Sequence, residues 1–297
     1  MSGIIPEFKT RMKYQAKLVR RFYRRAGRDV TLAANHQPRL SVSPVFFANS
    51  FPKSGTHLLT QVLEGFPLVG PAVDTSLPAV VMYEGASGRE RSNAEIFREL
   101  GRLSHGDIGY GHLHARPEIV EYFTRDGFCA YFILRDPRDV VISHVHYVTK
   151  IEPNHVHHAY YANTLTNFDE RLQTSILGRP EADNPFPDIA GRFAPFLDWL
   201  LHPEVLIIKY EDFMEERTAT VRKVLNHAVT RGFKPNIPEE QAVEKLEGMI
   251  DPQRSPTFRQ GKSGGWKTQF SPENKALFKL VAGEMLIKLG YEKDLDW

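Results

Sequence analysis

The sequence predicts an α/β fold in which a single domain is built on a central parallel sheet flanked by helices. Three short apolar segments support this prediction, at residues 45–49, 128–134 and 205–208, because each runs into a polar turn and then a helical pattern. Apolar strands that alternate with helices are typical of parallel sheets covered on both faces. Ligands of such sheets bind outside the carboxyl ends of the strands, so we expect the functional residues at these three junctions.

The first junction is a candidate site for a phosphate-like anion. The segment 45–49 is followed by the loop F-P-K-S-G-T-H at residues 51–57, and then by apolar residues at helical spacing. The N–H groups at the start of a helix favour a dianion. Gly55 lets the backbone approach the ligand and Lys53 adds a positive charge. An ordinary helix cap is the structural alternative.

The order of residues in this loop differs from that of a Walker A loop. The pattern G-x-x-x-x-G-K-[ST] needs glycine six residues before the lysine and immediately before it, and this sequence has Phe47 and Pro52 at those positions. Nothing clearly supplies a Walker B aspartate for magnesium either. A P-loop nucleotide kinase or ATPase is therefore the lesser alternative.

The second junction places a guanidinium and a hydroxyl where both can reach one phosphate. The segment 128–134 runs into Arg135, and Ser143 follows two helical turns further on. Arginine suits bidentate binding of an oxyanion. Asp136 and Asp139 are placed to hold the loop, and a solvated cap with local ion pairs is the alternative interpretation.

The rest of the chain contributes a third junction and two covering segments. The segment 205–208 runs into Tyr-Glu-Asp at 210–212, and the stretch 150–188 predicts helices and loops that cover the cleft. Residues 258–267, F-R-Q-G-K-S-G-G-W-K, combine cations and glycines in one loop. Such a loop can fold over an anionic ligand or lie on the surface. A closing helix is predicted over 272–289.

The composition limits the class of protein. The chain of 297 residues is 41% hydrophobic and 25% charged, with a single cysteine, Cys129. A lone cysteine excludes an internal disulfide and a Cys-rich metal cluster, and it favours a reducing compartment. No apolar run approaches the roughly 18 residues of a membrane span, and the basic N-terminus is not followed by the apolar run of a secretory signal. We therefore expect a cytoplasmic protein.

The N-terminal residues form a basic arm. Residues 1–30 hold nine Lys or Arg against two acidic residues, whereas the remainder holds 29 against 34. Apolar residues recur in the arm at helical spacing: Met12, Ala16, Val19, Phe22 and Tyr23. This spacing predicts an amphipathic helix with a cationic face. We assign residues 1–40 to the arm and 41–297 to the main domain. A solvated helix packed on the body is the expected arrangement, and peripheral contact with anionic lipid is the alternative.

The three motifs together resemble those of the sulfotransferases that use 3′-phosphoadenosine 5′-phosphosulfate (PAPS). The 5′-phosphosulfate loop of that family reads P-K-S-G-T, as residues 52–56 do. Its 3′-phosphate segment is an Arg followed eight residues later by Ser, which matches Arg135 and Ser143. Its C-terminal motif, R-K-G-x-x-G-x-W-K, is similar to residues 259–267 with two departures. The resemblance covers roughly residues 45–290.

This resemblance implies a role for each matching residue. The residues that hold the 5′-phosphosulfate would be Lys53, Ser54, Gly55, Thr56 and His57. Those at the 3′-phosphate would be Arg135, Ser143, Arg259, Gln260 and Gly261. Tyr210 would lie beside the adenine. The family's catalytic His matches His112, in the G-H-L-H of residues 111–114, with His114 as the second choice.

The implied reaction moves a sulfuryl group from PAPS to a hydroxyl or amine of a small-molecule, sugar or lipid acceptor, with adenosine 3′,5′-bisphosphate (PAP) as product. His112 would take the acceptor's proton, because a neutral imidazole suits a general base. Lys53 would neutralise the leaving oxygen, and Ser143 would hold Lys53 away until the acceptor arrives. A non-catalytic homologue that only binds nucleotide is the remaining alternative.

Neither a metal nor a nucleic acid is expected as a partner. A dense run of histidines lacks a nearby Cys or carboxylate that would complete a ligand set: His144, His146, His155, His157 and His158. Contact with the acceptor or a plain surface is the expected role of this run. No aromatic-rich sheet motif for nucleic acid accompanies the basic arm.

Four positions depart from the family pattern. Leu58 stands where a Trp often stacks on adenine, and Gln260 replaces a Lys or Arg. Gly265 replaces an Asp, and Tyr110 replaces a Lys two residues before the base. We expect these departures to affect nucleotide affinity more than the class of reaction. The stretch 267–272 also breaks a Lys-Thr-Val dimerisation segment, which leaves the oligomeric state open.

Overall fold

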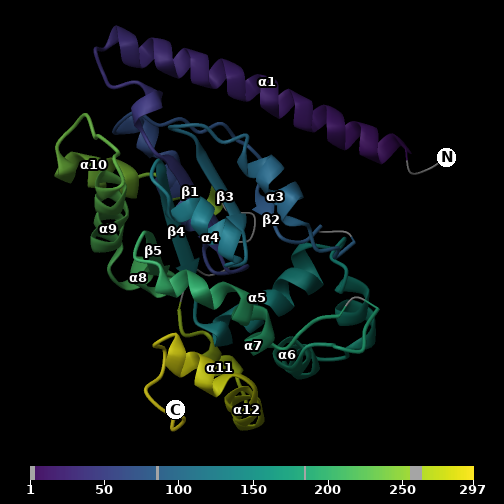
Figure 1. Ribbon diagram of the computed structural model, residues 1–297. Coiled ribbons are helices and arrows are strands. Elements are labelled where there is room, and N and C mark those ends of the chain that lie inside the picture. The colour runs from purple at the N-terminus through teal and green to yellow at the C-terminus, as the bar shows by residue number, and fades with distance from the viewer. Residues whose placement is uncertain (1–3, 85–86, 184, 255–262) are drawn as a thin grey trace.

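Five parallel strands form one sheet in the order β2-β3-β1-β4-β5 (Figure 1). In chain order they are β1 (Val45–Ser50), β2 (Val80–Val81), β3 (Ile108–His112), β4 (Phe128–Leu134) and β5 (Val205–Lys209). The structure is a computed structural model, and it describes residues 4–84, 87–183, 185–254 and 263–297. The predicted fold class and the three predicted strands are confirmed.

Helices cover both faces of the sheet, which explains why β1 and β4 are buried along their whole length and are mainly apolar. In β1, Phe46 and Ala48 pack into one core and Val45 and Phe47 into the other. The first core is completed by α2 (Thr56–Glu64), α9 (Arg217–Thr230) and α10 (Glu239–Glu247). The second is completed by α3 (Asn93–Leu100), α4 (Pro117–Thr124), α5 (Pro137–His146), α6 (Phe168–Leu177), α7 (Ile189–Phe193) and α12 (Pro272–Lys288).

Short helices complete the described chain. They are η1 (Leu40–Val42), η2 (Phe66–Leu68), two π-helical turns η3 (Tyr147–Ile151) and η4 (Tyr160–Thr164), η5 (Ala194–Leu201), α8 (Tyr210–Glu215), η6 (Pro252–Arg254) and α11 (Trp266–Gln269). The stretch 150–188 thus holds helices and loops, as predicted. The closing helix is confirmed as α12, which is interrupted by non-helical φ and ψ angles at Ala282.

Strand β3 is absent from the sequence-based prediction, and its two glycines explain why. Gly109 and Gly111 are poor strand formers by propensity. However, a Cβ at Gly111 would lie 2.1 Å from the carbonyl oxygen of Val80 on the neighbouring strand. Glycine is therefore required where the two backbones approach. Because β3 ends at His112, this imidazole stands at the carboxyl edge of the sheet, beside the end of β1.

The basic arm is helical, as predicted, but it turns its cationic face to the body. Helix α1 (Ile4–Ala34) lies across the amino end of the sheet (Figure 1). Arg21 and Arg25 both pair with the buried Asp107, which directly precedes β3. Arg28 donates hydrogen bonds to three backbone carbonyl groups between residues 67 and 72. Amphipathic surface helices usually bury the apolar face. In this helix, the arginines face the body instead, because carboxylates and backbone carbonyl groups at the amino end of the sheet bind them.

Candidate functional site

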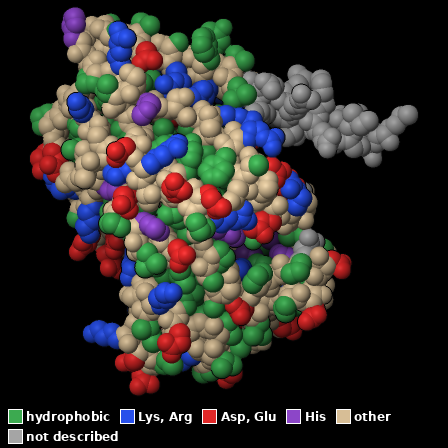
Figure 2. All heavy atoms as spheres, in the orientation of Figure 1, with side chains coloured by type: hydrophobic (Ala, Val, Ile, Leu, Met, Phe, Trp, Pro, Cys, Tyr) green, Lys and Arg blue, Asp and Glu red, His purple; other side chains and the backbone are tan. Residues whose placement is uncertain are grey.

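The carboxyl ends of the strands bring the candidate residues to one edge of the sheet. Residues 53–57 follow β1, His112 ends β3, Arg135 follows β4, and Tyr210 opens α8 after β5. Figure 2 shows the surface hollowed at this level, with histidine side chains inside the hollow. Residues from all three predicted junctions therefore share one region.

The loop between β1 and α2 has the backbone form of an anion-binding turn. Lys53 and Gly55 both adopt left-handed φ angles, of 70° and 98°, and such a conformation is strained for a lysine. Gly55 is the N-cap of α2 and has no side chain to cap the helix, so the first N–H groups lack a side-chain acceptor. The hydroxyl of Ser54 is fully buried and has no hydrogen-bond partner among the described residues. A bound oxyanion would satisfy these donors.

Tyr210 joins the first and second motifs. A Cβ at Gly55 would lie 2.7 Å from Cδ2 of Tyr210, so the ring is packed directly on the loop. The guanidinium of Arg135 lies 4.5 Å from the centroid of the same ring. The Tyr210 ring therefore sets how closely Arg135 and the loop approach each other.

The site holds cations that repel one another. Burial, and then the charge of Arg135, lower the pKa of Lys53 to about 8. Burial, and then the charge of Lys53, lower the pKa of His57. Each shift means that the protonated form is disfavoured while no anion is bound. An anion between these groups would relieve the repulsion.

Asp139 connects the second motif to the C-terminal motif. Its carboxylate accepts hydrogen bonds from the N–H groups of Gly264, at 2.8 Å, and Trp266, at 2.9 Å. Arg135 lies 3.4 Å from the same carboxylate. The start of α11 is therefore docked beside Arg135. The predicted residues Arg259, Gln260 and Gly261 lie outside the described residues.

A buried network holds the turn between β4 and α5. Asp136 accepts a hydrogen bond from the N–H of Arg138 and pairs with its guanidinium. Glu211, next to Tyr210, accepts hydrogen bonds from the N–H of Asp136 at 3.1 Å and from the hydroxyl of Tyr291 at 3.0 Å. The prediction that Asp136 and Asp139 hold this turn is confirmed, although the ion pair of Asp136 is buried rather than solvated.

His112 is oriented by Ser50, which the motifs do not single out. Nδ1 of His112 lies 3.1 Å from the carbonyl oxygen of Ser50 and 3.0 Å from its Oγ. A carbonyl oxygen can only accept, so Nδ1 carries the proton and the neutral ring keeps its lone pair on Nε2. The Oγ of Ser50 also lies 2.6 Å from Oγ1 of Thr56 in the anion loop. Only the three-dimensional contact reveals this role of Ser50, at the end of a strand.

The imidazole of His112 is neutral at physiological pH. Burial lowers its pKa to about 4, and the charges of His57 and Lys53 act in the same direction. His114, the second candidate base, instead packs against Tyr83 and Phe196, with ring centroids 5.6 and 4.8 Å away. The structure therefore links His112 to the loop and places His114 in an aromatic cluster.

The Lys53 ammonium contacts Tyr147, which lies one helical turn beyond Ser143. Nζ of Lys53 lies 3.9 Å from the centroid of the Tyr147 ring, within the range of a cation–π interaction. Ser143 itself lies partly exposed on α5. Its proposed contacts with Lys53 and a phosphate stay predictions.

Two residues of the histidine run, His144 and His155, form an aromatic cluster with Tyr147 and Phe186. We call this cluster the aromatic wall. The ring centroids of Tyr147 and His155 are 6.0 Å apart, and those of His155 and His144 are 5.9 Å apart. His144 also stacks on Phe186 and bonds through Nδ1 to Oγ of Ser175. No group of three metal-ligating side chains occurs in the part of the chain that the structure describes. The wall is suited to contact with a partly apolar molecule.

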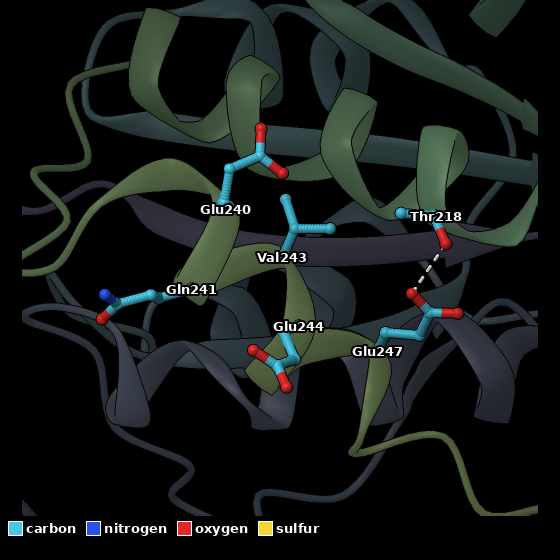
Figure 3. Close-up of a pocket in the computed structure, with 6 residues that line it drawn as sticks. All are labelled: Thr218, Glu240, Gln241, Val243, Glu244 and Glu247. Atoms are coloured by element: carbon cyan, nitrogen blue, oxygen red, sulfur yellow. Dashed lines mark hydrogen bonds between the residues drawn. The ribbon is translucent and has the colours of Figure 1, made fainter.

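A second hollow, of about 510 Å³, lies between α9 and α10 (Figure 3). Its lining residues are Thr218, Glu240, Gln241, Val243, Glu244 and Glu247. The hydroxyl of Thr218 donates a hydrogen bond to Glu247 at 2.8 Å. Three carboxylates in one lining repel an anion, so this hollow does not suit the ligand that the loop favours.

Replacing Gly55 by alanine should destabilise the protein more than the same replacement at Gly232. Both glycines have a φ of 98°, so both variants carry the same backbone strain, about 1–2 kcal/mol. At Gly55 the new methyl group also meets Tyr210, whereas no described atom lies within 4 Å at Gly232. Urea unfolding should show an extra loss of about 1–3 kcal/mol for Gly55→Ala. Equal losses would contradict the packing of Tyr210 on the loop.

Comparisons with known proteins agree with this geometry. A sequence model of the sulfotransferase domain matches residues 131–290, which is more than half of the chain. A search among curated proteins finds no match. The fold is similar to that of mouse sulfotransferase SULT7A1, solved in complex with PAP, with 20% sequence identity and a TM-score of 0.55 over 84% of this chain and 85% of that one.

Two structures of retinol dehydratase are also similar in fold, one with androsterone and inactive cofactor PAP and the other with retinol and PAP. Each is 16% identical to this chain, with a TM-score of 0.54 over 85% of this chain and 82% or 83% of the other. The match to the domain model confirms the family that the motifs predict, and the protein belongs to the sulfotransferase family.

Proposed function

We propose that this protein transfers a sulfuryl group from PAPS to a hydroxyl or amine of an acceptor, with His112 as the general base. The observation that supports this most directly is the hydrogen-bonded connection from His112 through Ser50 to Thr56 of the anion loop. It places a neutral imidazole beside a loop that favours an anion, which is the pairing that a sulfuryl transfer requires.

The residues of the site fit a donor with two anionic ends. At one end are the ammonium of Lys53, the buried hydroxyl of Ser54 and the N–H groups that begin α2. At the other end is Arg135, beside Tyr210. Following the family pattern, we assign the 3′-phosphate to Arg135 with Ser143, Arg259, Gln260 and Gly261, and the 5′-phosphosulfate to residues 53–57. Tyr210 would contact the adenine.

When it is bound, PAPS supplies an activated sulfuryl group. Nε2 of His112 carries the lone pair that accepts the acceptor's proton, while Nδ1–H stays hydrogen-bonded to Ser50. That bond stabilises the imidazolium as it forms. Lys53 places a positive charge where the oxygen of the leaving group develops negative charge.

Burial is the main cause of the low pKa of His112, and a smaller part of the shift depends on whether an anion is bound. The charges of Lys53 and His57 contribute to it, and a dianion on the loop would offset both. The pKa of His112 should therefore rise when the loop is loaded, which strengthens the base when the donor is present. The imidazole therefore stays neutral at physiological pH while no anion is on the loop, and it becomes more basic when the donor binds.

The aromatic wall supports an acceptor with a hydroxyl group on a partly apolar body. Tyr147 and His155 are partly exposed next to Lys53, and they combine ring faces with polar atoms. The retinol dehydratase structures hold retinol or androsterone, and such molecules belong in the first acceptor panel. Phenols, sugars and lipids with free hydroxyl groups complete it.

Substitution of His112 tests the proposed reaction. His112→Ala should lower transfer of labelled sulfate from PAPS by about 10²–10⁴-fold, while the Kd for PAP changes little. His114→Phe, which preserves the aromatic packing, is the control and should retain transfer. Normal turnover by His112→Ala would refute the assignment.

The alternative function is tested by thermal stabilisation of the wild type. Stronger stabilisation by ATP and magnesium than by PAP would indicate a kinase or ATPase.

Substitution of Ser50 tests how the base is oriented. Ser50→Ala keeps the carbonyl acceptor but removes Oγ, so kcat should fall about 5–30-fold with little change in PAP affinity. The acidic limb of the pH–rate profile should move to lower pH, because the imidazolium loses one hydrogen bond. Ser50→Thr should restore both properties. An unchanged pH profile in Ser50→Ala would show that the hydroxyl does not act on His112.

The pH dependence of PAP binding tests the role of Lys53. Its pKa is about 8 without a ligand, and a bound anion favours the protonated form. Affinity should therefore be highest below pH 8 and fall above it, by up to about tenfold per pH unit. Lys53→Arg should remove this fall, because a guanidinium stays protonated. The same slope in both proteins, measured by calorimetry, would exclude Lys53 as the titrating group.

A further inference from the structure

The outer face of α1 is an exposed apolar stripe. Its side chains recur at alternating spacings of three and four residues, which places them on one side of the helix. The stripe consists of Ala16, Val19, Tyr23, Ala26, Val30 and Ala33, with Phe22 beside it. Val19 is 56% exposed, and Phe22, Tyr23 and Val30 are 68–70% exposed. Figure 2 shows hydrophobic side chains gathered on this part of the helix.

The opposite face of α1 holds the helix in this orientation. Arg21 and Arg25 share the buried carboxylate of Asp107, and Arg28 binds three backbone carbonyl groups. Arg24 pairs with Asp74 on the same side. Rotating α1 to bury the stripe against the body would break all of these contacts. The exposure of the stripe is therefore enforced by the fold, and a contiguous exposed apolar surface of this kind indicates a binding face.

The charge around the stripe is positive. Lys17 and Arg20 are exposed beside it, and Lys9, Arg11 and Lys13 precede them in the same helix. Only Glu7 and Asp29 are acidic in the first 30 residues, and the carboxylate of Asp29 faces the N–H of Leu40. A second copy of the helix would bring the same positive charge to the contact. An anionic lipid surface complements both the charge and the apolar stripe.

We propose that α1 binds an anionic membrane surface, with the apolar stripe at the headgroup boundary and the flanking cations on the lipid phosphates and carboxylates. This contact is interfacial, and no helix among the described residues has the length and apolarity to cross a bilayer. Helix α1 lies at the amino end of the sheet, whereas the candidate active site lies at the carboxyl edge (Figure 1). The cleft would therefore face away from the bilayer, and the proposal does not depend on the proposed reaction.

Vesicle flotation of the full chain tests this proposal. Binding should occur to vesicles of phosphatidylcholine with phosphatidylserine, not to phosphatidylcholine alone, and should weaken as salt screens the charges. The double variant Phe22→Ser/Tyr23→Ser should lower the partition coefficient at least about tenfold, because it removes the two exposed rings that the lipid would bury. Lys17→Gln/Arg20→Gln should lower it by roughly 10–30-fold.

Two controls separate a specific loss from misfolding. Leu280→Ser replaces a side chain that is 84% exposed on α12 and should leave vesicle binding unchanged. All variants should keep the wild-type unfolding curve, since the substituted side chains are all exposed. Absence of binding to phosphatidylserine vesicles at low salt would overturn the proposal. A dimer detected by light scattering and abolished by Phe22→Ser/Tyr23→Ser would also overturn it and assign the stripe to a second copy.

Discussion

Repulsion between cations at the ends of neighbouring strands is the constraint on which the candidate active site depends. Lys53 and Arg135 follow β1 and β4, which are hydrogen-bonded along their length, so the two apolar cores hold the charges together. Burial, and then the charge of Arg135, lower the pKa of Lys53 to about 8, which records the cost of placing this ammonium in the site. The strained φ of Lys53 and the buried hydroxyl of Ser54 add to that cost. An anion would offset the repulsion and accept a hydrogen bond from the Ser54 hydroxyl, which gives a reason for the strained backbone to persist in this loop.

The same constraint links the anion loop to the chemistry of the cleft. In the chain of contacts from His112 through Ser50 to Thr56, the carbonyl of Ser50 sets which ring nitrogen carries the proton. The direction of the hydrogen bonds then leaves the Thr56 hydroxyl free to donate to an anion on the loop. One hydrogen-bonded network thus connects the loop that would bind the donor with the imidazole that would act as the base.

The two ends of the sheet differ in charge, and this difference explains the placement of α1. The amino end presents the buried carboxylate of Asp107 and backbone carbonyl groups, which bind the arginines of the arm. The carboxyl ends of β1 and β4 present Lys53, Arg135 and the N–H groups that begin α2, and the acidic side chains nearby, Asp136, Asp139 and Glu211, are held in ion pairs and hydrogen bonds. The arm is therefore drawn to the end of the sheet away from the candidate active site, with its apolar stripe turned outward.

The pattern of apolar strands, polar turns and helices was sufficient to predict the α/β class, the strands β1, β4 and β5, and the loop at Lys53. These features follow from local composition and from the rule that parallel strands end at one edge. The strand β3, the contact of Ser50 with His112, the contact of Lys53 with Tyr147 and the outward stripe of α1 were decided by tertiary structure. Each depends on which backbone or charge lies opposite in space, as where Gly111 meets Val80, and no local pattern encodes that neighbour.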